Sequence, residues 1–106
     1  MDIENLQQRL RDFAAARQWQ PYQTPKNLAM AMVVEAAELV EIFQWLTPEE
    51  SQNLDAARRE HLGEEIADVL LYLLQIAAHS GVDIEAAVER KLTLNARKYP
   101  APAGSD

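Results

Sequence analysis

Two pairs of acidic residues interrupt the most apolar stretches of this 106-residue sequence, and each pair is spaced by three positions. The first pair is Glu35 and Glu38, and the second is Glu65 and Asp68. Residues three apart lie on one face of an α-helix. The apolar stripe that surrounds the first pair consists of Leu28, Met32, Leu39, Ile42 and Leu46. An ionised carboxylate inside such a stripe is costly unless it is paired or bound to a metal, so any fold must provide these groups with partners.

The remaining pattern predicts an all-α protein. The sequence has only 3 Gly and 5 Pro, and helix-start signals recur before its apolar runs. Thr24-Pro25 and the capping box of Thr47 and Glu50 are such signals, Asp83 caps a last helix, and Gly81 ends the one before it. The expected helices cover about residues 3–18, 25–46, 58–80 and 84–98, with a loop at 19–24 and a short helical connector from Thr47. We expect one four-helix-bundle domain over residues 1–100 and a flexible tail at 101–106.

Composition excludes several classes of function. The net charge of −7 argues against non-specific nucleic-acid binding, which requires a basic surface. The absence of cysteine excludes a disulfide scaffold, a thiolate zinc site and a cysteine nucleophile. The N-terminal residues are polar and no apolar run approaches about 18 residues, so we expect neither a signal peptide nor a membrane span, and a cytoplasmic location.

If the two acidic faces meet, four carboxylates converge. Such like charges repel strongly, and a hard cation relieves the repulsion. Oxygen-only ligands suit Mg²⁺, with Mn²⁺ as an alternative. The competing interpretation is that each acidic pair lies on a solvated helix face. A di-iron site is disfavoured because it requires Glu-x-x-His, and Arg58 and Ile76 stand three positions before His61 and His79. No role is assigned to these two histidines.

The spacing of the two acidic pairs resembles the E-x-x-E…E-x-x-D signature of the MazG-like all-α nucleoside triphosphate pyrophosphohydrolases, in particular their dCTP pyrophosphatase branch. The resemblance extends over about residues 5–100. The segments that carry it are Ala16–Trp19, Pro25–Leu28, Glu38–Trp45, Glu64–Leu73 and Lys91–Pro100.

The resemblance implies hydrolysis of a nucleoside triphosphate between its α and β phosphates, giving a monophosphate and pyrophosphate. Glu35, Glu38, Glu65 and Asp68 would hold Mg²⁺, with Glu38 as the expected general base. The residues that would contact the substrate are Trp19, Gln23, Trp45, Tyr72, Lys91, Asn95 and Tyr99. Gln23 departs from the pattern, because dCTP-specific members carry a histidine there, and this departure bears on the base preference rather than on the reaction.

Simpler interpretations exist for most of these side chains. Trp45 suits a core or interface, Tyr72 and Tyr99 suit packing, and the basic residues near the last helix end suit the helix dipole.

We also expect a homo-oligomer, because the apolar arc of the third helix is too wide for one small bundle to cover. The resemblance implies a tetramer with sites at subunit interfaces, so a dimer or a dimer of dimers is predicted. Two alternative functions remain: a phosphoribosyl-ATP-type pyrophosphohydrolase and a non-catalytic helical module that binds a partner protein.

Overall fold

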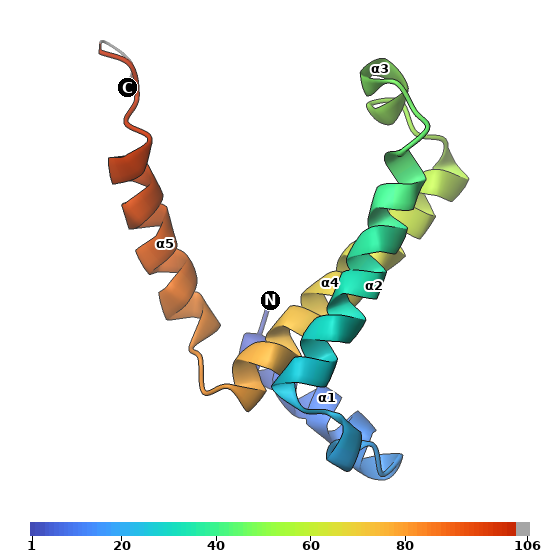
Figure 1. Cartoon of the computed structure of the whole chain (residues 1–106), viewed down its shortest axis with the longest axis vertical. Coiled ribbons are helices and arrows are strands. Elements are labelled where there is room, and N and C mark those ends of the chain that lie inside the picture. The colour runs from blue at the N-terminus through green and yellow to red at the C-terminus, as the bar shows by residue number, and fades with distance from the viewer. Residues whose placement is uncertain (104–106) are drawn as a thin grey trace.

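The protein is all-helical, as predicted (Figure 1). A computed structural model describes residues 1–103. Its elements are α1 (Ile3–Ala16), η1 (Gln20–Tyr22), α2 (Pro25–Phe43), α3 (Pro48–Ser51), α4 (Ala56–His79) and α5 (Ile84–Lys98). Of the predicted flexible tail, residues 101–103 are exposed and non-helical, and 104–106 lie outside the described residues.

Each α-helix begins at a side chain that accepts a hydrogen bond from a backbone N–H three residues later. The capping residues are Asp2, Thr24, Thr47, Asp55 and Asp83. The predicted starts at Thr24, Thr47 and Asp83 are confirmed, including the capping box of Thr47 and Glu50. α4 begins at Ala56, two residues before the predicted start, because Asp55 accepts from the Arg58 N–H.

The ends of α1 and α4 share one geometry, the Schellman motif. At α4, Val82 N–H donates to Ala77 O at 2.9 Å, and Gly81 has a φ of +68°. At α1, Trp19 N–H donates to Ala14 O at 2.9 Å, and Gln18 occupies the same left-handed region with a φ of +56°. α1 therefore ends at Ala16 rather than at residue 18. α2 likewise ends at Phe43, three residues before the predicted Leu46.

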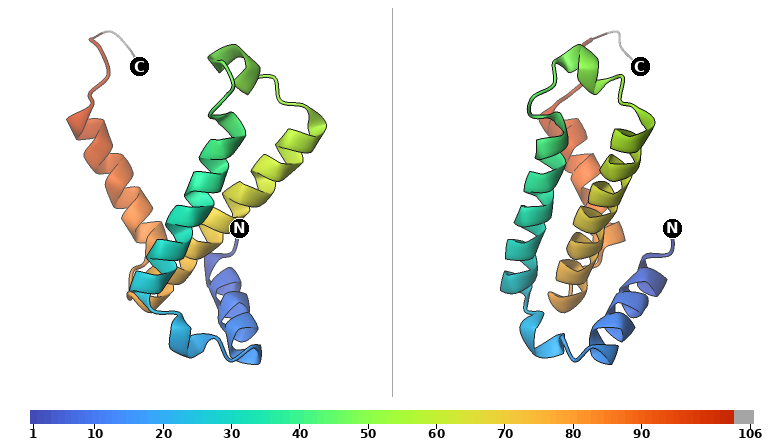
Figure 2. Two further views of the ribbon diagram at one scale, coloured as in Figure 1. Left: turned by 45° about the vertical axis from the view of Figure 1, so that its right-hand side comes forward. Right: turned by 90° about the vertical axis from the view of Figure 1, so that its right-hand side faces the viewer.

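α2 and α4 form the centre of the molecule. They run side by side in opposite directions, joined through α3, and α1 packs against the C-terminal part of α4 (Figure 2). Gln7 on α1 donates a hydrogen bond to Leu74 O on α4 at 2.9 Å. The fully buried apolar residues are few and are shared among these three helices: Ala14, Leu28, Leu74 and Ala77.

α5 stands apart from the other helices, at 105° to α4 (Figure 1). None of its residues is buried. The Cα radius of gyration is 17.4 Å, against about 13 Å for a compact domain of this length. The accessible surface is 8338 Å², against roughly 6,000 Å² for a compact monomer of this mass. The four predicted long helices are present, but the single chain packs only three of them together.

None of the described helices is by itself long and apolar enough to cross a membrane; only the bent pair of α4 and α5 together has the required length and composition.

The two Schellman ends give a matched pair of stability predictions. Gly81→Ala should lower the free energy of unfolding by about 1 kcal/mol, because a Cβ at positive φ is strained although no atom lies within 4 Å of it. Gln18→Gly should raise the free energy of unfolding by up to about 1 kcal/mol, because it removes the same strain. Urea denaturation measures both, and a neutral Gly81→Ala would contradict the assignment of a left-handed end.

Candidate metal centre

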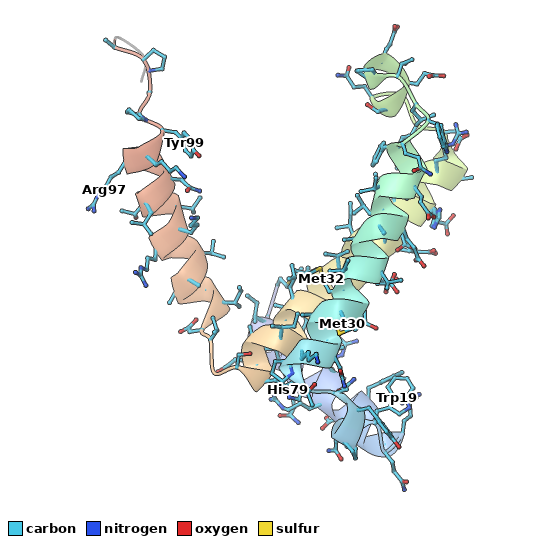
Figure 3. All side chains as sticks on the ribbon, viewed as in Figure 1. Trp19, Met30, Met32, His79, Arg97 and Tyr99 are labelled. Carbon is cyan, nitrogen blue, oxygen red and sulfur yellow. The ribbon has the colours of Figure 1, made fainter. Side chains whose placement is uncertain are left out.

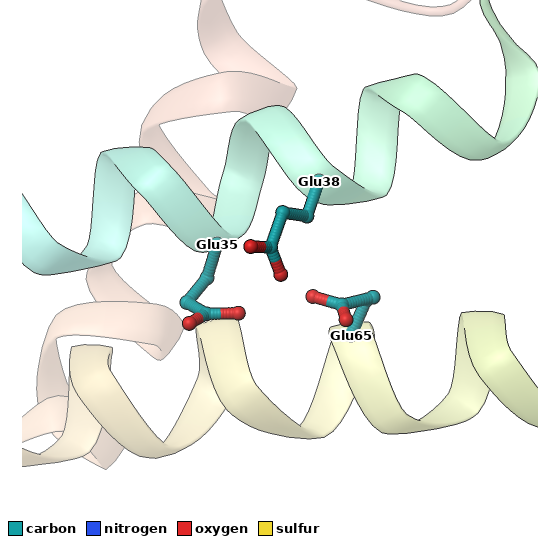
Figure 4. A group of neighbouring side chains, drawn as sticks. All are labelled: Glu35, Glu38 and Glu65. Carbon is teal, nitrogen blue, oxygen red and sulfur yellow. The ribbon is translucent and has the colours of Figure 1, made fainter.

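Three carboxylates converge between α2 and α4. Glu35 and Glu38 extend from successive turns of α2, and Glu65 extends toward them from α4 (Figure 4). One oxygen from each of the three lies within 4.8 Å of the others. We call Glu35, Glu38 and Glu65 the carboxylate cluster. The structure brings these three side chains together, and their role as metal ligands stays a prediction.

Glu65 is the most confined member of the cluster. It is 6% exposed, and it is the one buried charged residue within residues 1–103. Its Oε1 lies 3.3 Å from Nε2 of His61, one helical turn earlier on α4. Its Oε2 is buried and has no hydrogen-bond partner. A buried carboxylate oxygen without a partner is costly, so this atom requires a cation or a proton.

The surroundings in the cluster change the pKa of Glu35, whose side chain is half-buried. Its burial, the adjacent Glu65 carboxyl group and the negative charges of Glu38 and Asp68 raise the pKa of Glu35 from 4.5 to about 7. Near neutral pH the cluster therefore holds a proton where a cation could bind instead. The donor set consists of oxygen atoms from three carboxyl groups, one of them unpartnered, and this set fits Mg²⁺ or Mn²⁺.

Asp68 lies beside the cluster rather than within it. Its side chain is exposed, and its oxygens are not among the ligand atoms that lie within 4.8 Å of one another. Its negative charge nevertheless contributes to the raised pKa of Glu35. Asp68 as a fourth metal ligand therefore stays a prediction.

A hollow of about 470 Å³ adjoins the cluster on the side toward α3. Its lining residues are Glu38, Glu41, Ile42, Trp45, Leu46, Arg58 and His61. We call it the Trp45 hollow, because Trp45 lines it and is 87% exposed. Glu38 belongs to both the hollow and the cluster, so a molecule in this hollow would contact the cluster directly.

A second hollow, also of about 470 Å³, lies between α1 and α4. Its lining residues are Leu6, Arg9, Leu10, Phe13, Asp68, Leu71, Tyr72 and Gln75. Trp19 does not line it but packs edge-on against Phe13, with ring centroids 5.5 Å apart. The predicted substrate residues Trp45 and Tyr72 therefore line two different hollows, and Trp19 adjoins the one that Tyr72 lines.

The other predicted substrate residues lie farther away. Gln23 lines a small recess between α1 and the C-terminal end of α4. Lys91 and Asn95 are on α5 and Tyr99 follows it, on the arm that stands apart from α2 and α4 (Figure 3). A single chain therefore does not bring these three residues to the carboxylate cluster, and their contact with substrate stays a prediction.

Two basic side chains near the cluster were not singled out from the sequence. His61 contacts Glu65, and Arg58 lines the Trp45 hollow while it pairs with Asp55 at 3.7 Å. The sequence indicates the contact between His61 and Glu65 only through their spacing of four residues, which places both on one face of a helix.

A family model described as the MazG-like family matches residues 30–106. The chain belongs to the MazG-like family. The predicted membership is thus confirmed, and this MazG-like protein carries three of its predicted ligands in one cluster.

This MazG-like protein also resembles individual proteins. It is 42% identical over 101 residues to dCTP pyrophosphatase 1 of Homo sapiens. The matched region covers 93% of this chain and 59% of that protein. It is 40% identical over 100 residues to dCTP pyrophosphatase 1 of Bos taurus, with 92% and 59% covered. The chain thus spans about three-fifths of the length of these curated relatives. A crystal structure of a pyrophosphatase from Archaeoglobus fulgidus DSM 4304 matches with a TM-score of 0.86 and 44% identity, over 92% of both chains.

The raised pKa of Glu35 predicts a pH dependence of stability in metal-free protein. Between about pH 4.5 and 7 the folded state binds more protons than the unfolded state, so the free energy of unfolding should fall as pH rises. Glu35→Gln cannot ionise and should reduce this decline, leaving a variant with a higher Tm than the parent at pH 8. Thermal denaturation in EDTA across pH 4 to 8 tests this, and parallel curves for parent and variant would contradict it.

Proposed function

We propose that this protein is a Mg²⁺-dependent nucleoside triphosphate pyrophosphohydrolase that releases pyrophosphate and a nucleoside monophosphate. The observation that carries the proposal is the unpartnered, buried Oε2 of Glu65 facing two further carboxylates across the α2–α4 interface. Structural carboxylates are normally paired, whereas a group that lacks a partner inside a cluster of like charges suits a cation. The dCTP pyrophosphatase and pyrophosphatase names of the relatives support the same reaction class.

Each acidic residue has a role in this proposal. Glu35, Glu38 and Glu65 would hold Mg²⁺, or Mn²⁺ in its place, and Asp68 would complete the set from its adjacent turn of α4. When bound, such an ion neutralises phosphate charge and makes a water molecule more acidic. Glu38 also borders the Trp45 hollow, so it can accept a proton from a water molecule that attacks a phosphate seated there.

We propose a pyrimidine deoxynucleotide, such as dCTP or a modified dCTP, as the substrate. Trp45 is exposed beside Glu38, which suits stacking on a base close to the cluster. Trp19, Gln23 and Tyr72 stay predicted substrate residues, although in one chain they lie outside this hollow. The names of the mammalian relatives favour cytosine.

The active protein is proposed to be a homodimer or a dimer of dimers. Its surface exceeds that of a compact monomer by roughly 2,000 Å², within the range that stable dimers bury. Apolar side chains are exposed on α2, at Met30, Val33, Val34 and Val40, and on α5, at Val88, Leu92 and Leu94. Packing of α5 against a second copy would cover these residues and would bring Lys91, Asn95 and Tyr99 toward the phosphates at a neighbour's cluster.

Two alternative functions fit the structure less well. A phosphoribosyl-ATP-type pyrophosphohydrolase would share the metal chemistry, but the exposed Trp45 beside the cluster favours a pocket for a nucleobase. A non-catalytic interaction module would use the same apolar faces, yet it gives no reason for an unpartnered Glu65 oxygen between two helices.

A panel of canonical and modified nucleoside triphosphates tests the reaction. With Mg²⁺ we expect pyrophosphate release, greatest with cytosine deoxynucleotides, and none in EDTA. Glu38→Gln should lower kcat by about a hundredfold or more, because it removes a ligand charge and the proposed base. Glu60→Gln, a charge-matched change at an exposed position of α4, should retain activity. Release of orthophosphate, or full activity of Glu38→Gln, would refute the proposal.

Light scattering tests the assembly. We expect a mass of two or four chains, and Leu92→Glu should shift the protein toward a monomer, because it buries a charge in the proposed interface. Gln52→Glu, an exposed change near α3, should leave the mass unaltered. A parent protein that is monomeric at micromolar concentration would contradict the proposed assembly.

A further inference from the structure

His61 occupies a defined place beside the carboxylate cluster. It precedes Glu65 by four residues in the N-terminal half of α4, so both Cβ atoms are fixed on one helical face. Its Nε2 lies 3.3 Å from Glu65 Oε1, and the side chains of His61 and Glu65 are 56% and 8% exposed. The ring therefore covers one side of a carboxylate that is otherwise enclosed.

The two oxygens of Glu65 have different surroundings. Oε1 faces the imidazole, whereas Oε2 is buried and has no hydrogen-bond partner. The last torsion of a glutamate side chain is soft, so an unrestrained carboxylate rotates over a broad range. An N–H group that donates to Oε1 would restrict that rotation and keep Oε2 directed into the cluster.

His61 stands outside the ligand set itself. The atoms that lie within 4.8 Å of one another belong to Glu35, Glu38 and Glu65, and no imidazole nitrogen is among them. Within residues 1–103, His61 is also the one basic side chain that pairs with a member of the cluster. The imidazole thus has the place of an outer-shell partner, which orients a ligand and leaves the ion to the carboxylates.

We propose that His61 is a positioning residue for the metal centre, and that its Nε2–H donates to Glu65 Oε1 so that Oε2 is held ready for a divalent cation. This inference rests on the proposed function, since it requires that the cluster binds a cation. It adds a residue that acts through Glu65 rather than on the substrate.

The test is cation affinity in nucleotide-free protein, measured by calorimetric titration with Mn²⁺ and by the rise in Tm that Mg²⁺ produces. His61→Ala should weaken Mn²⁺ binding about tenfold, the lower end of the range for outer-shell partners. His61→Gln keeps an N–H donor of similar reach and should recover most of the affinity. His79→Ala, an exposed histidine at the end of the same helix, is the matched control and should bind as the parent does.

The outcomes separate this inference from the proposed function. If the parent binds neither cation, both are overturned. If the parent binds and His61→Ala binds equally well, the positioning role is overturned while the metal centre stands. Equal weakening in His61→Ala and His61→Gln would overturn the donor role, because the glutamine retains the N–H group. Weakening in His61→Ala with recovery in His61→Gln supports it.

Discussion

The contact between α2 and α4 is the interaction on which the rest of the structure depends, and it brings three carboxyl groups together. Helix pairs are normally stabilised by apolar contact along their length. Here Glu35, Glu38 and Glu65 interrupt that contact in the middle of the pair. Burial, the adjacent Glu65 carboxyl group and the charges of Glu38 and Asp68 raise the pKa of Glu35, so the cluster binds a proton more tightly than a free carboxylate does. A divalent cation would turn the same arrangement from a destabilising feature into a stabilising one, which couples ligand binding to the stability of the central helix pair.

The apolar contacts that offset this repulsion lie to one side of the cluster. Leu28, Leu74 and Ala77 are buried where the start of α2, the end of α4 and α1 meet. Toward α3 the pair opens into the Trp45 hollow instead. The cluster therefore lies between a packed end and an open end, so its carboxylates are carried by helices and adjoin the open side. Ligands on helices keep their mutual geometry better than ligands on loops would.

Local features of this structure could be predicted from sequence because they depend on neighbouring residues. Thr24, Thr47 and Asp83 begin helices through bonds to backbone three residues away, and the apolar stripe interrupted by Glu35 indicated the helix face on which carboxylates converge. Features that depend on side-chain rotamers or on distant packing could not be predicted in the same way. The spacing of Glu65 and Asp68 does not show that one turns into the cluster while the other remains exposed.

The packing partner of α5 could not be predicted from the sequence. The cap at Asp83 correctly predicted a helix, yet this local signal does not state which chain supplies the surface that covers it. Four of the ten basic residues lie between residues 90 and 98, on or beside the arm that stands apart from the acidic cluster. A magnesium-bound triphosphate presents both a cation and uncompensated phosphate oxygens, so it needs carboxylates and basic donors within a few ångströms of each other. In the single chain Arg58 and His61 are near the cluster, but the four basic residues of α5 are not, and joining the arm of one copy to the cluster of another would bring them there. On this proposal α5 stands apart and its basic residues are missing from the cluster for one reason. The same contact with a second copy would cover the apolar face of α5 and bring its positive charge to the cluster.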